Sequence, residues 1–346
     1  MKKEGVENNL IKKISKLLET AKQTVLNTVN QTMALTYFEI GRMIVEEEQK
    51  GKGRADYGTQ LIYEISKRLT EDFGKGFSIT NIKQMRSFYL IYSKGQTVSD
   101  ELQSTYLTPV TIVQEFKLSW SHYLKLMRIE DENERRFYEI EAYKNNWSLR
   151  ELQRQYDSGL YTRLAYSRNK NKIIELSAKG QIIEKAKDAI KDPYILEFLE
   201  LPELSGYSEN DFEQKLIDKL EQFILELGKG FTFVARQKRI TFDEKHFRID
   251  LVFYNRILKC FVLIDLKMGE LKHNDLGQMQ MYVNYYDRNI RLEDENKTIG
   301  IILCKDKNES VVRYTLPENN EQIFASKYLT ILPSKNTLKK LLANKD

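Results

Sequence analysis

Charged side chains lie inside a stretch of the sequence that otherwise has the composition of buried β-strands. Residues 231–287 contain three runs rich in Phe, Val, Ile and Tyr, followed by a helical pattern. The second run carries Asp250, and the third carries Asp265 and Lys267, two positions apart. Burying an unpaired charge costs several kcal/mol, so any fold that buries these strands must give the three side chains partners or a ligand.

The three apolar runs are predicted to form an antiparallel meander, because the connections between them are short. They span residues 231–241, 247–254 and 260–267. Side chains alternate along a strand, so Asp265 and Lys267 share one face, and Asp250 lies beside Asp265 if the second and third strands are neighbours. The same alternation predicts one apolar face on the second strand, made of Phe247, Ile249, Leu251 and Phe253.

Two carboxylates placed side by side predict a metal site, because they repel each other unless a cation separates them. Ligation by oxygen suits Mg²⁺ or Mn²⁺, which bind through one or two carboxylates, waters and phosphate oxygens. Lys267 beside such an ion can hold an attacking water or stabilise the charge of a transition state. The alternative is a buried Asp–Lys ion pair that organises the sheet. The second Asp and a preceding helix that carries Glu favour the metal site.

The length of 346 residues predicts two domains, since a single hydrophobic core rarely extends over so long a chain. Residues 1–165 show the spacing of amphipathic helices and form the expected all-helical N-terminal domain. Residues 166–205 are lysine-rich and are predicted to connect it to an α+β or α/β domain over residues 206–346. Besides the meander, this domain is expected to hold two helices and two later strands, at 208–227, 274–287, 298–304 and 326–332.

Residues 58–92 have the pattern of a helix-turn-helix. A helical stripe ends at a turn with Gly74 and Gly76, and Ser78 can cap a second helix. Lys83 and Arg86 on that helix could contact DNA, although any helical hairpin with a hydrated face has the same pattern.

Composition indicates a protein without membrane spans, in a reducing, cytoplasmic setting. No apolar run approaches the roughly 20 residues that a membrane helix needs. The two cysteines, Cys260 and Cys304, form neither a zinc motif nor a disulfide framework, and the three histidines are scattered. With 55 basic and 50 acidic residues, the net charge of +5 permits a nucleic-acid partner without requiring one.

Three segments resemble the YhcG-like family of PD-(D/E)XK nucleases, in the restriction-endonuclease-like superfamily. They are FILELGKGFTFVARQKR at 223–239, VLIDLK at 262–267 and GQMQMYVNYYD at 277–287. The resemblance covers nearly the whole chain and implies an αβββαβ domain with a mixed sheet after a helical domain. Two positions depart from the common motif: Ile249 stands where proline is usual, and Asp265 where Glu is commoner.

The resemblance also implies roles for individual residues. Asp250, Asp265 and the backbone carbonyl of Leu266 would hold a divalent ion, and Lys267 would position or activate water. A Gln-x-x-x-Tyr element is formed by Gln278 and Tyr282. These lie on one helical face and could contact metal-bound water or the DNA backbone.

A further acid is expected from the helix before the strands, and two candidates compete. Glu213 matches the position used by many superfamily members and would join the metal ligands, while Glu226 is the alternative. On the first strand, Arg236, Gln237 and Arg239 are candidates for phosphate contact, and Gln237 could belong to the metal site if it faces Asp250.

These expectations describe a Mg²⁺-dependent nuclease that hydrolyses phosphodiester bonds in nucleic acid. DNA is the expected substrate, and Mn²⁺ is the alternative ion. A homodimer is also expected, because restriction-type folds usually act as dimers. The alternatives are a nucleic-acid-binding protein with a degenerate catalytic domain, and a protein-interaction component of a defence or toxin–antitoxin system.

Overall fold

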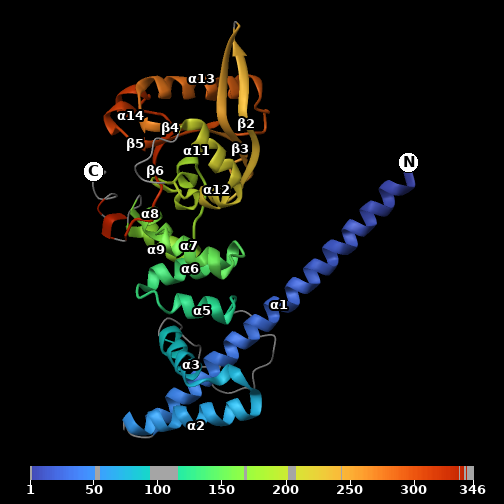
Figure 1. The fold of residues 1–346 in the computed structure, drawn as a ribbon, viewed down its shortest axis with the longest axis vertical. Helices are drawn as coiled ribbons and strands as arrows, with labels where there is room; N and C mark the ends of the chain where they lie inside the picture. Colours follow the sequence, from blue (N-terminus) through green and yellow to red (C-terminus); the bar gives the residue numbers. More distant parts are fainter. Residues whose placement is uncertain are drawn as a thin grey trace. The chain divides into compact units, whose positions relative to one another are not determined.

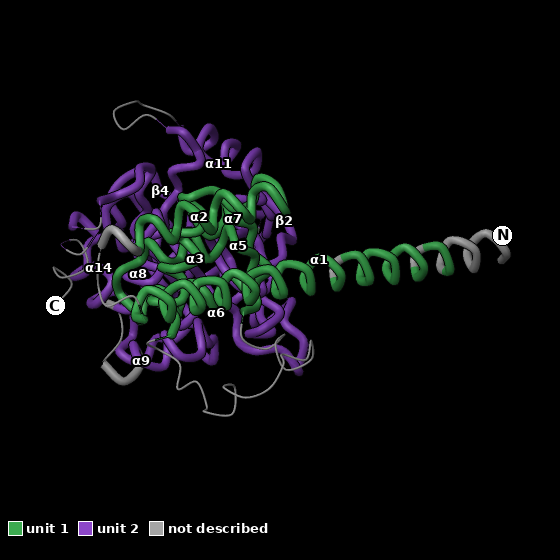
Figure 2. Tube along the Cα trace, turned by 90° about the horizontal axis from the view of Figure 1, so that it is seen from below, with its two compact units in different colours: residues 1–153 green, residues 154–346 purple. Residues whose placement is uncertain are grey.

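The computed structural model describes residues 2–50, 55–93, 116–166, 170–201, 208–242, 244–334, 336–338 and 340. The chain divides into two compact units, residues 1–153 and 154–346 (Figure 2). No helix in the described part of the chain is both long enough and apolar enough to cross a membrane.

The N-terminal unit is helical wherever it has regular structure in the described residues, as predicted (Figure 1). Its elements are α1 (Lys2–Lys50), α2 (Ala55–Phe73), the 3₁₀ turn η1 (Lys75–Phe77), α3 (Ile79–Tyr92), α5 (Trp120–Leu126), α6 (Glu132–Lys144) and most of α7 (Leu149–Asp157). Gly41 permits the close crossing of α1 and α3, because a Cβ there would lie 2.1 Å from the carbonyl oxygen of Met85. Phe88 is fully buried against a ring of other aromatic side chains, which fixes α3 in this core.

The segment predicted as a helix-turn-helix does form two helices joined by the η1 turn. The Ser78 hydroxyl accepts a hydrogen bond from the backbone N–H of Asn81 at 3.3 Å and so caps α3. Lys83 is exposed, whereas Arg86 is half-buried and binds Glu48 of α1 at 2.7 Å. Recognition of DNA by this helix stays a prediction.

The C-terminal unit is built on a six-stranded mixed sheet with the strand order β1-β6-β5-β4-β3-β2. Its strands are β1 (Tyr194–Ile195), β2 (Phe231–Phe242), β3 (Lys245–Asn255), β4 (Cys260–Glu270), β5 (Ile299–Asp306) and β6 (Ile323–Leu329). Strands β2, β3 and β4 pair antiparallel, and β4, β5, β6 and β1 pair parallel. The predicted meander and the mixed sheet are therefore confirmed.

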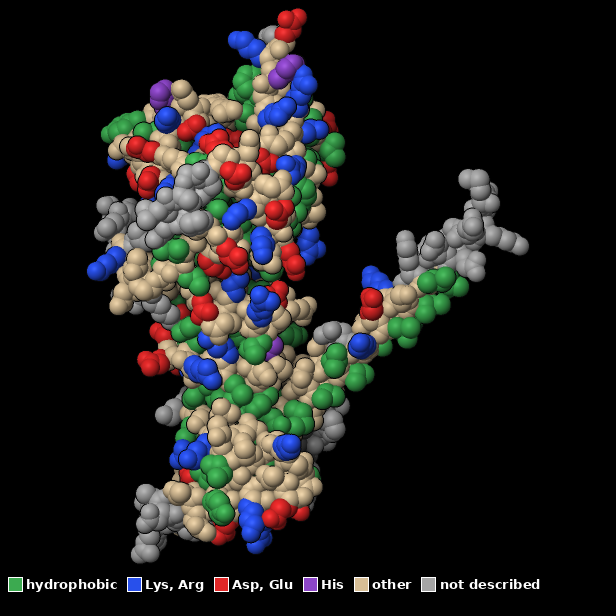
Figure 3. All heavy atoms as spheres, in the orientation of Figure 1, with side chains coloured by type: hydrophobic (Ala, Val, Ile, Leu, Met, Phe, Trp, Pro, Cys, Tyr) green, Lys and Arg blue, Asp and Glu red, His purple; other side chains and the backbone are tan. Residues whose placement is uncertain are grey.

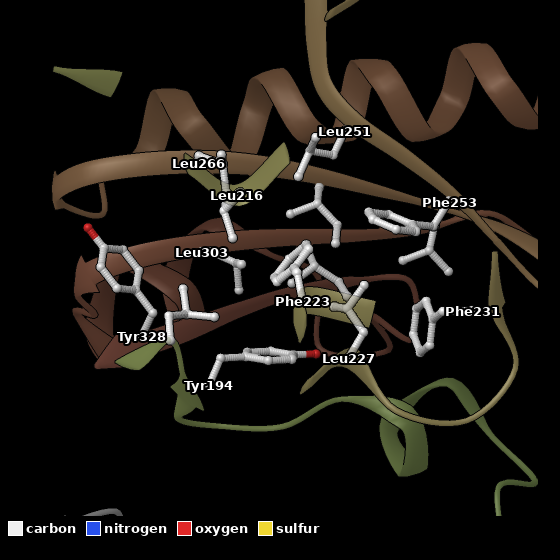
Figure 4. Close-up of a cluster of buried hydrophobic side chains, with 14 of the residues drawn as sticks. Tyr194, Leu216, Phe223, Leu227, Phe231, Leu251, Phe253, Leu266, Leu303 and Tyr328 are labelled. Atoms are coloured by element: carbon white, nitrogen blue, oxygen red, sulfur yellow. The ribbon is translucent and has the colours of Figure 1, made fainter. Parts of the chain in front are cut away.

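Helices cover both faces of this sheet. The remaining helical elements are α8 (Leu160–Tyr166), α9 (Lys170–Lys179), α10 (Ala186–Ala189), η3 (Glu197–Leu199), α11 (Glu209–Asp218), α12 (Leu220–Leu227), α13 (His273–Asn289) and α14 (Glu309–Thr315). One apolar core joins α11 and α12 to the sheet through Leu216, Phe223 and Leu227 (Figure 4). A second core joins α13 to the opposite face through Leu276, Met279, Val283 and Tyr286.

The single helix predicted over residues 208–227 is in fact two helices, α11 and α12. The break falls at Lys219, whose backbone leaves helical geometry at φ −113° and ψ 30°. Phe212 and Leu216 of α11 and Phe223 of α12 can therefore all pack into the same core.

The predicted apolar face of β3 is wrong at one end. Leu251 and Phe253 pack with α11 and α12, but Ile249 packs with Val252 in the α13 core. Residues three apart on a regular strand point to opposite faces, so the alternation is interrupted between them. The cause is the adjoining strand: Gln237 has a φ of 46° and is not a register partner of Asp250.

Candidate active site

Asp250 lies where β3 separates from β4. The register of these two strands starts at Leu251, which faces Ile264, so the preceding residues have no partner on β4. Asp250 Oδ2 instead accepts a 2.8 Å hydrogen bond from the backbone N–H of Leu266. The side chain of Asp250 thus replaces a main-chain acceptor and is held next to the segment that carries Asp265, as predicted.

Asp265 and Lys267 project from β4 to the same side. The Lys267 Nζ atom lies 2.9 Å from Asp265 Oδ2. Asp265 is only 3% exposed, and burial together with the charge of Asp250 raises its pKa to about 7, although Lys267 acts in the opposite direction. Burial lowers the pKa of Lys267, but the charge and hydrogen bond of Asp265 outweigh this effect and leave it raised.

Glu213 is the helix acid that lies at this site. Gln237 bridges Glu213 and Asp250. Its Nε2 donates to Glu213 Oε2 at 2.5 Å and to Asp250 Oδ1 at 3.1 Å. Burial raises the pKa of Glu213, and the negative charge of Asp250 adds to the rise. Gln237 therefore faces Asp250 and belongs to the same cluster of side chains.

The carboxylate oxygens of Asp250, Asp265 and Glu213 fit a divalent ion with oxygen ligands. Glu213 Oε1 is buried without a hydrogen-bond donor, since the nearby Arg236 Nε, at 3.5 Å, forms an ion pair but no hydrogen bond. A cation would also relieve the repulsion that raises the pKa of Asp265. In the described residues no three His, Cys, Asp or Glu side chains converge on one point.

Glu226, the rival candidate, is not at the site. It is fully buried and lies 2.6 Å from Arg163 Nη1, with Arg154 Nη2 at 3.4 Å. Its Oε1 also accepts the backbone N–H of Ile195 at 2.9 Å, and Lys191 binds its carbonyl oxygen. None of its described contacts involves Asp250 or Asp265. The break at Lys219 turns α12 so that Glu226 faces β1 and α8 instead.

The sequence offered little signal for this ion cluster, because its members are far apart. Arg163 belongs to the stretch predicted as the helical domain, and Lys191 to the predicted connecting region. Arg154 has the spacing of a surface or phosphate-binding residue, yet it pairs with Glu197 at 3.0 Å and with Glu226.

Tyr282 and Gln278 lie together on α13, as their spacing predicts, but Tyr282 does not reach the surface. Its side chain is fully buried, and its hydroxyl donates to the carbonyl oxygen of Arg248 at 3.0 Å. Gln278 Nε2 donates to the same hydroxyl. Burial, followed by the charge of Asp265, raises the pKa of Tyr282 to about 12. The prediction that Tyr282 contacts nucleic acid does not fit this buried position. Tyr282 anchors β3 beside Asp250.

The two arginines predicted to contact phosphate have different surroundings. Arg236 lies at the site and donates to Gln214 of α11 at 3.1 Å. Arg239 is exposed on the part of β2 beyond the site, where its Nη2 lies 2.6 Å from His246 Nε2.

The αβββαβ order, the mixed sheet and the acid pair with its lysine at the edge of β4 define a nuclease fold of the PD-(D/E)XK type. Residues 187–343 match the family model described as the YhcG PDDEXK nuclease domain, and residues 13–163 match the DUF1016 N-terminal domain. Over 338 residues the chain is 39% identical to "Putative nuclease YhcG" of Escherichia coli (strain K12). That match covers 93% of this chain and 90% of the relative. The chain belongs to the YhcG nuclease family.

Two solved structures match part of this chain at low similarity. A repair endonuclease from Pyrococcus abyssi is 19% identical over 36% of this chain and 49% of its own, with a TM-score of 0.25. The structure of an EndoMS–dsDNA complex is 18% identical over 39% of this chain and 49% of its own, with a TM-score of 0.27.

Proposed function

We propose that this chain is a Mg²⁺- or Mn²⁺-dependent nuclease that hydrolyses phosphodiester bonds in DNA and acts in the cytoplasm. One observation carries the proposal: Asp250 and Asp265 are held side by side where the pairing of β3 with β4 ends, with Lys267 directly against Asp265. A purely structural ion pair would need one carboxylate, and the second raises the energy of the site unless a cation or a proton is bound.

Asp250, Asp265 and the carbonyl of Leu266 would hold the ion. Glu213 shares the Gln237 amide with Asp250 and would act on the ion through that amide or through a water ligand. When bound, the ion would supply Lewis-acid stabilisation of the negative charge that develops on the phosphate. Lys267 would then leave Asp265 and orient the water that attacks in line with the leaving oxygen. Gln237 would keep Glu213 and Asp250 at a constant separation.

A substrate panel tests the activity. Purified full-length chain is expected to cleave double-stranded DNA in Mg²⁺ or Mn²⁺ and to lose all cleavage in excess EDTA, because the carboxylates cannot neutralise the phosphate without a cation. Single-stranded DNA and both forms of RNA, incubated in parallel, measure the substrate preference. Binding with no turnover in either metal would instead support the degenerate, binding-only alternative.

We further propose that the family dimer expected for this fold forms through α1. Its N-terminal half carries an exposed apolar stripe that includes Ile14, Leu18 and Val25, which are 48%, 64% and 62% exposed. Lys13, Lys16 and Lys22 make this half basic, while residues 23–38 hold no charged residue. Antiparallel pairing of two copies would place basic segments against neutral ones, would avoid like charges and would bury the stripe.

Disruption of this stripe gives a measurable change of mass. Leu18→Asp with Val25→Asp is expected to convert a dimer to a monomer in sedimentation equilibrium, because charges would be buried against each other. Asn27→Asp, on the exposed opposite side of the same helix, is the matched control and should leave the mass unchanged. A wild-type chain that sediments as a monomer at high micromolar concentration contradicts the proposal.

A further inference from the structure

Beyond the site, β2 and β3 continue as a two-stranded arm. The register between β3 and β4 ends at Leu251, but the register between β2 and β3 extends to Phe242 and Lys245. We define the arm as residues 238–242 and 244–249, which project past α13 (Figure 1). The arm lies between Gln237 and Asp250 in the sequence, so its base adjoins the candidate active site.

The two faces of the arm differ. Ile240 and Ile249 on one face are buried, and both pack in the α13 core. On the other face, Arg239 is the register partner of Arg248, and Thr241 is the partner of His246. All four of these side chains are exposed, and Figure 3 shows Lys, Arg and His side chains gathered over this hairpin. The arm is thus held to the protein by its apolar face and presents its polar face to solvent.

The pairing of Arg239 with Arg248 is unfavourable without a ligand. Side chains directly opposite each other on antiparallel strands have Cβ atoms about 5 Å apart, and like charges there are destabilising. In the described part of the chain, the ion pairs nearest the arm involve Arg236 and Lys267, and neither of these two guanidinium groups takes part in one. Arg239 is hydrogen-bonded to His246, which is not an anion. A phosphate between the two guanidinium groups stabilises such a pair, because its oxygens accept hydrogen bonds from the N–H groups of both.

The position of the pair relative to Asp250 suggests which phosphate it binds. Arg248 precedes Asp250 by two residues, a distance of about 7 Å along an extended strand. A nucleic-acid backbone that presents one phosphate at Asp250 would pass over Arg248 with a neighbouring phosphate. The major groove of B-form DNA also admits a two-stranded β-ribbon, whereas the deep and narrow major groove of RNA duplexes does not.

We propose that the outer face of this arm, through Arg239 and Arg248, binds the backbone of double-stranded DNA next to the bond to be cleaved. The proposal deepens the proposed function by naming a duplex as the substrate and the arm as its binding element. It rests on that function for the identity of the site, but the binding can be measured without catalysis.

The test compares DNA binding of full-length variants in EDTA, where no cleavage is expected. Arg239→Gln with Arg248→Gln should weaken binding to a DNA duplex about tenfold or more. The slope of log affinity against log salt should fall by about two, because two phosphate contacts are lost. Lys305→Gln with Arg313→Gln removes the same charge at two exposed positions away from the arm and should leave both quantities near wild type.

Arg239→Glu separates binding from folding. It places a carboxylate opposite Arg248, so the melting temperature should stay the same or rise while duplex affinity falls. Unchanged duplex affinity in the Gln pair overturns the proposal, and so does an equal loss on single-stranded DNA or on duplex RNA. If Arg239→Gln with Arg248→Gln loses duplex binding but the wild type cleaves no substrate in Mg²⁺ or Mn²⁺, DNA binding by the arm is supported and the proposed nuclease activity is contradicted.

Discussion

Replacement of Asp265 by Asn is expected to abolish cleavage and to leave the fold intact. The carboxylate is buried beside Asp250 and is bound by Lys267, and with Asp250 it forms the pair of acids that we propose to hold the cation. Loss of one such electrostatic group typically lowers turnover by about 10²–10³-fold, and loss of the metal with it lowers turnover further. Asp250→Ala and Lys267→Ala should each have effects of the same order.

The fold should survive because Asn is nearly the same size as Asp and the substitution removes repulsion from Asp250. We expect the melting temperature of Asp265→Asn in metal-free buffer at neutral pH to equal or exceed that of the wild type. Asp306→Asn is the matched control, since it changes an exposed carboxylate on β5 and should retain full cleavage. Cleavage at the wild-type rate by Asp250→Ala, Asp265→Asn and Lys267→Ala would show that the activity resides elsewhere.

Removal of the Glu226 carboxylate is expected to give the largest loss of stability. Arg163 and Lys191 are almost completely buried, and both lie against this carboxylate, which serves as their shared counter-ion. Breaking a buried pair by removing one partner costs about 3–5 kcal/mol in the free energy of unfolding, because the other charge stays buried and uncompensated. Urea denaturation of Glu226→Ala at pH 7 measures this loss.

The same residue predicts a pH dependence. Despite burial, which acts in the opposite direction, the charges of Arg163, Lys191 and Arg154 lower the pKa of Glu226 to about 2, from an ordinary value of 4.5. A carboxyl group whose folded pKa is depressed stabilises the protein above its unfolded pKa. This contribution, about 3 kcal/mol, is lost as the pH falls from 4.5 towards 2. Glu226→Gln should lack this part of the acid-induced loss of stability.

Glu221 provides the control for both measurements, since it lies on the same helix and is exposed. Glu221→Ala should change the free energy of unfolding by less than about 1 kcal/mol. A Glu226→Ala variant as stable as Glu221→Ala would mean that the buried cations are neutralised in another way. A loss of cleavage by Glu226→Ala at a temperature where it remains folded would reopen a catalytic role for this residue.

Much of the catalytic domain could be predicted from local pattern. The three apolar runs with short connections became an antiparallel meander, and residues two apart on β4 kept Asp265 and Lys267 on one side. These features depend on the period of a strand and the length of a turn, which neighbouring residues determine. The Gln278–Tyr282 pair followed in the same way from the period of a helix.

The choice between Glu213 and Glu226 depended on packing between distant segments. Both glutamates lie in one amphipathic stretch and look equivalent along the chain. The break at Lys219 and the positions of Arg163 and Lys191 direct Glu226 into an ion cluster and leave Glu213 beside Gln237. The helical spacing of apolar residues predicts neither the break at Lys219 nor the ion partners of Glu226.

By itself, the sequence determined the kinds of secondary structure, the order of the strands along the chain and the pairing of an acid with a lysine on β4. Only the tertiary structure decided which glutamate meets Asp250, that Tyr282 is buried, and that Gln237 interrupts the alternation of β2 and β3. The reason is physical. Periodicity is a property of adjacent residues, whereas burial, charge pairing and strained backbone depend on segments that only the folded chain brings together.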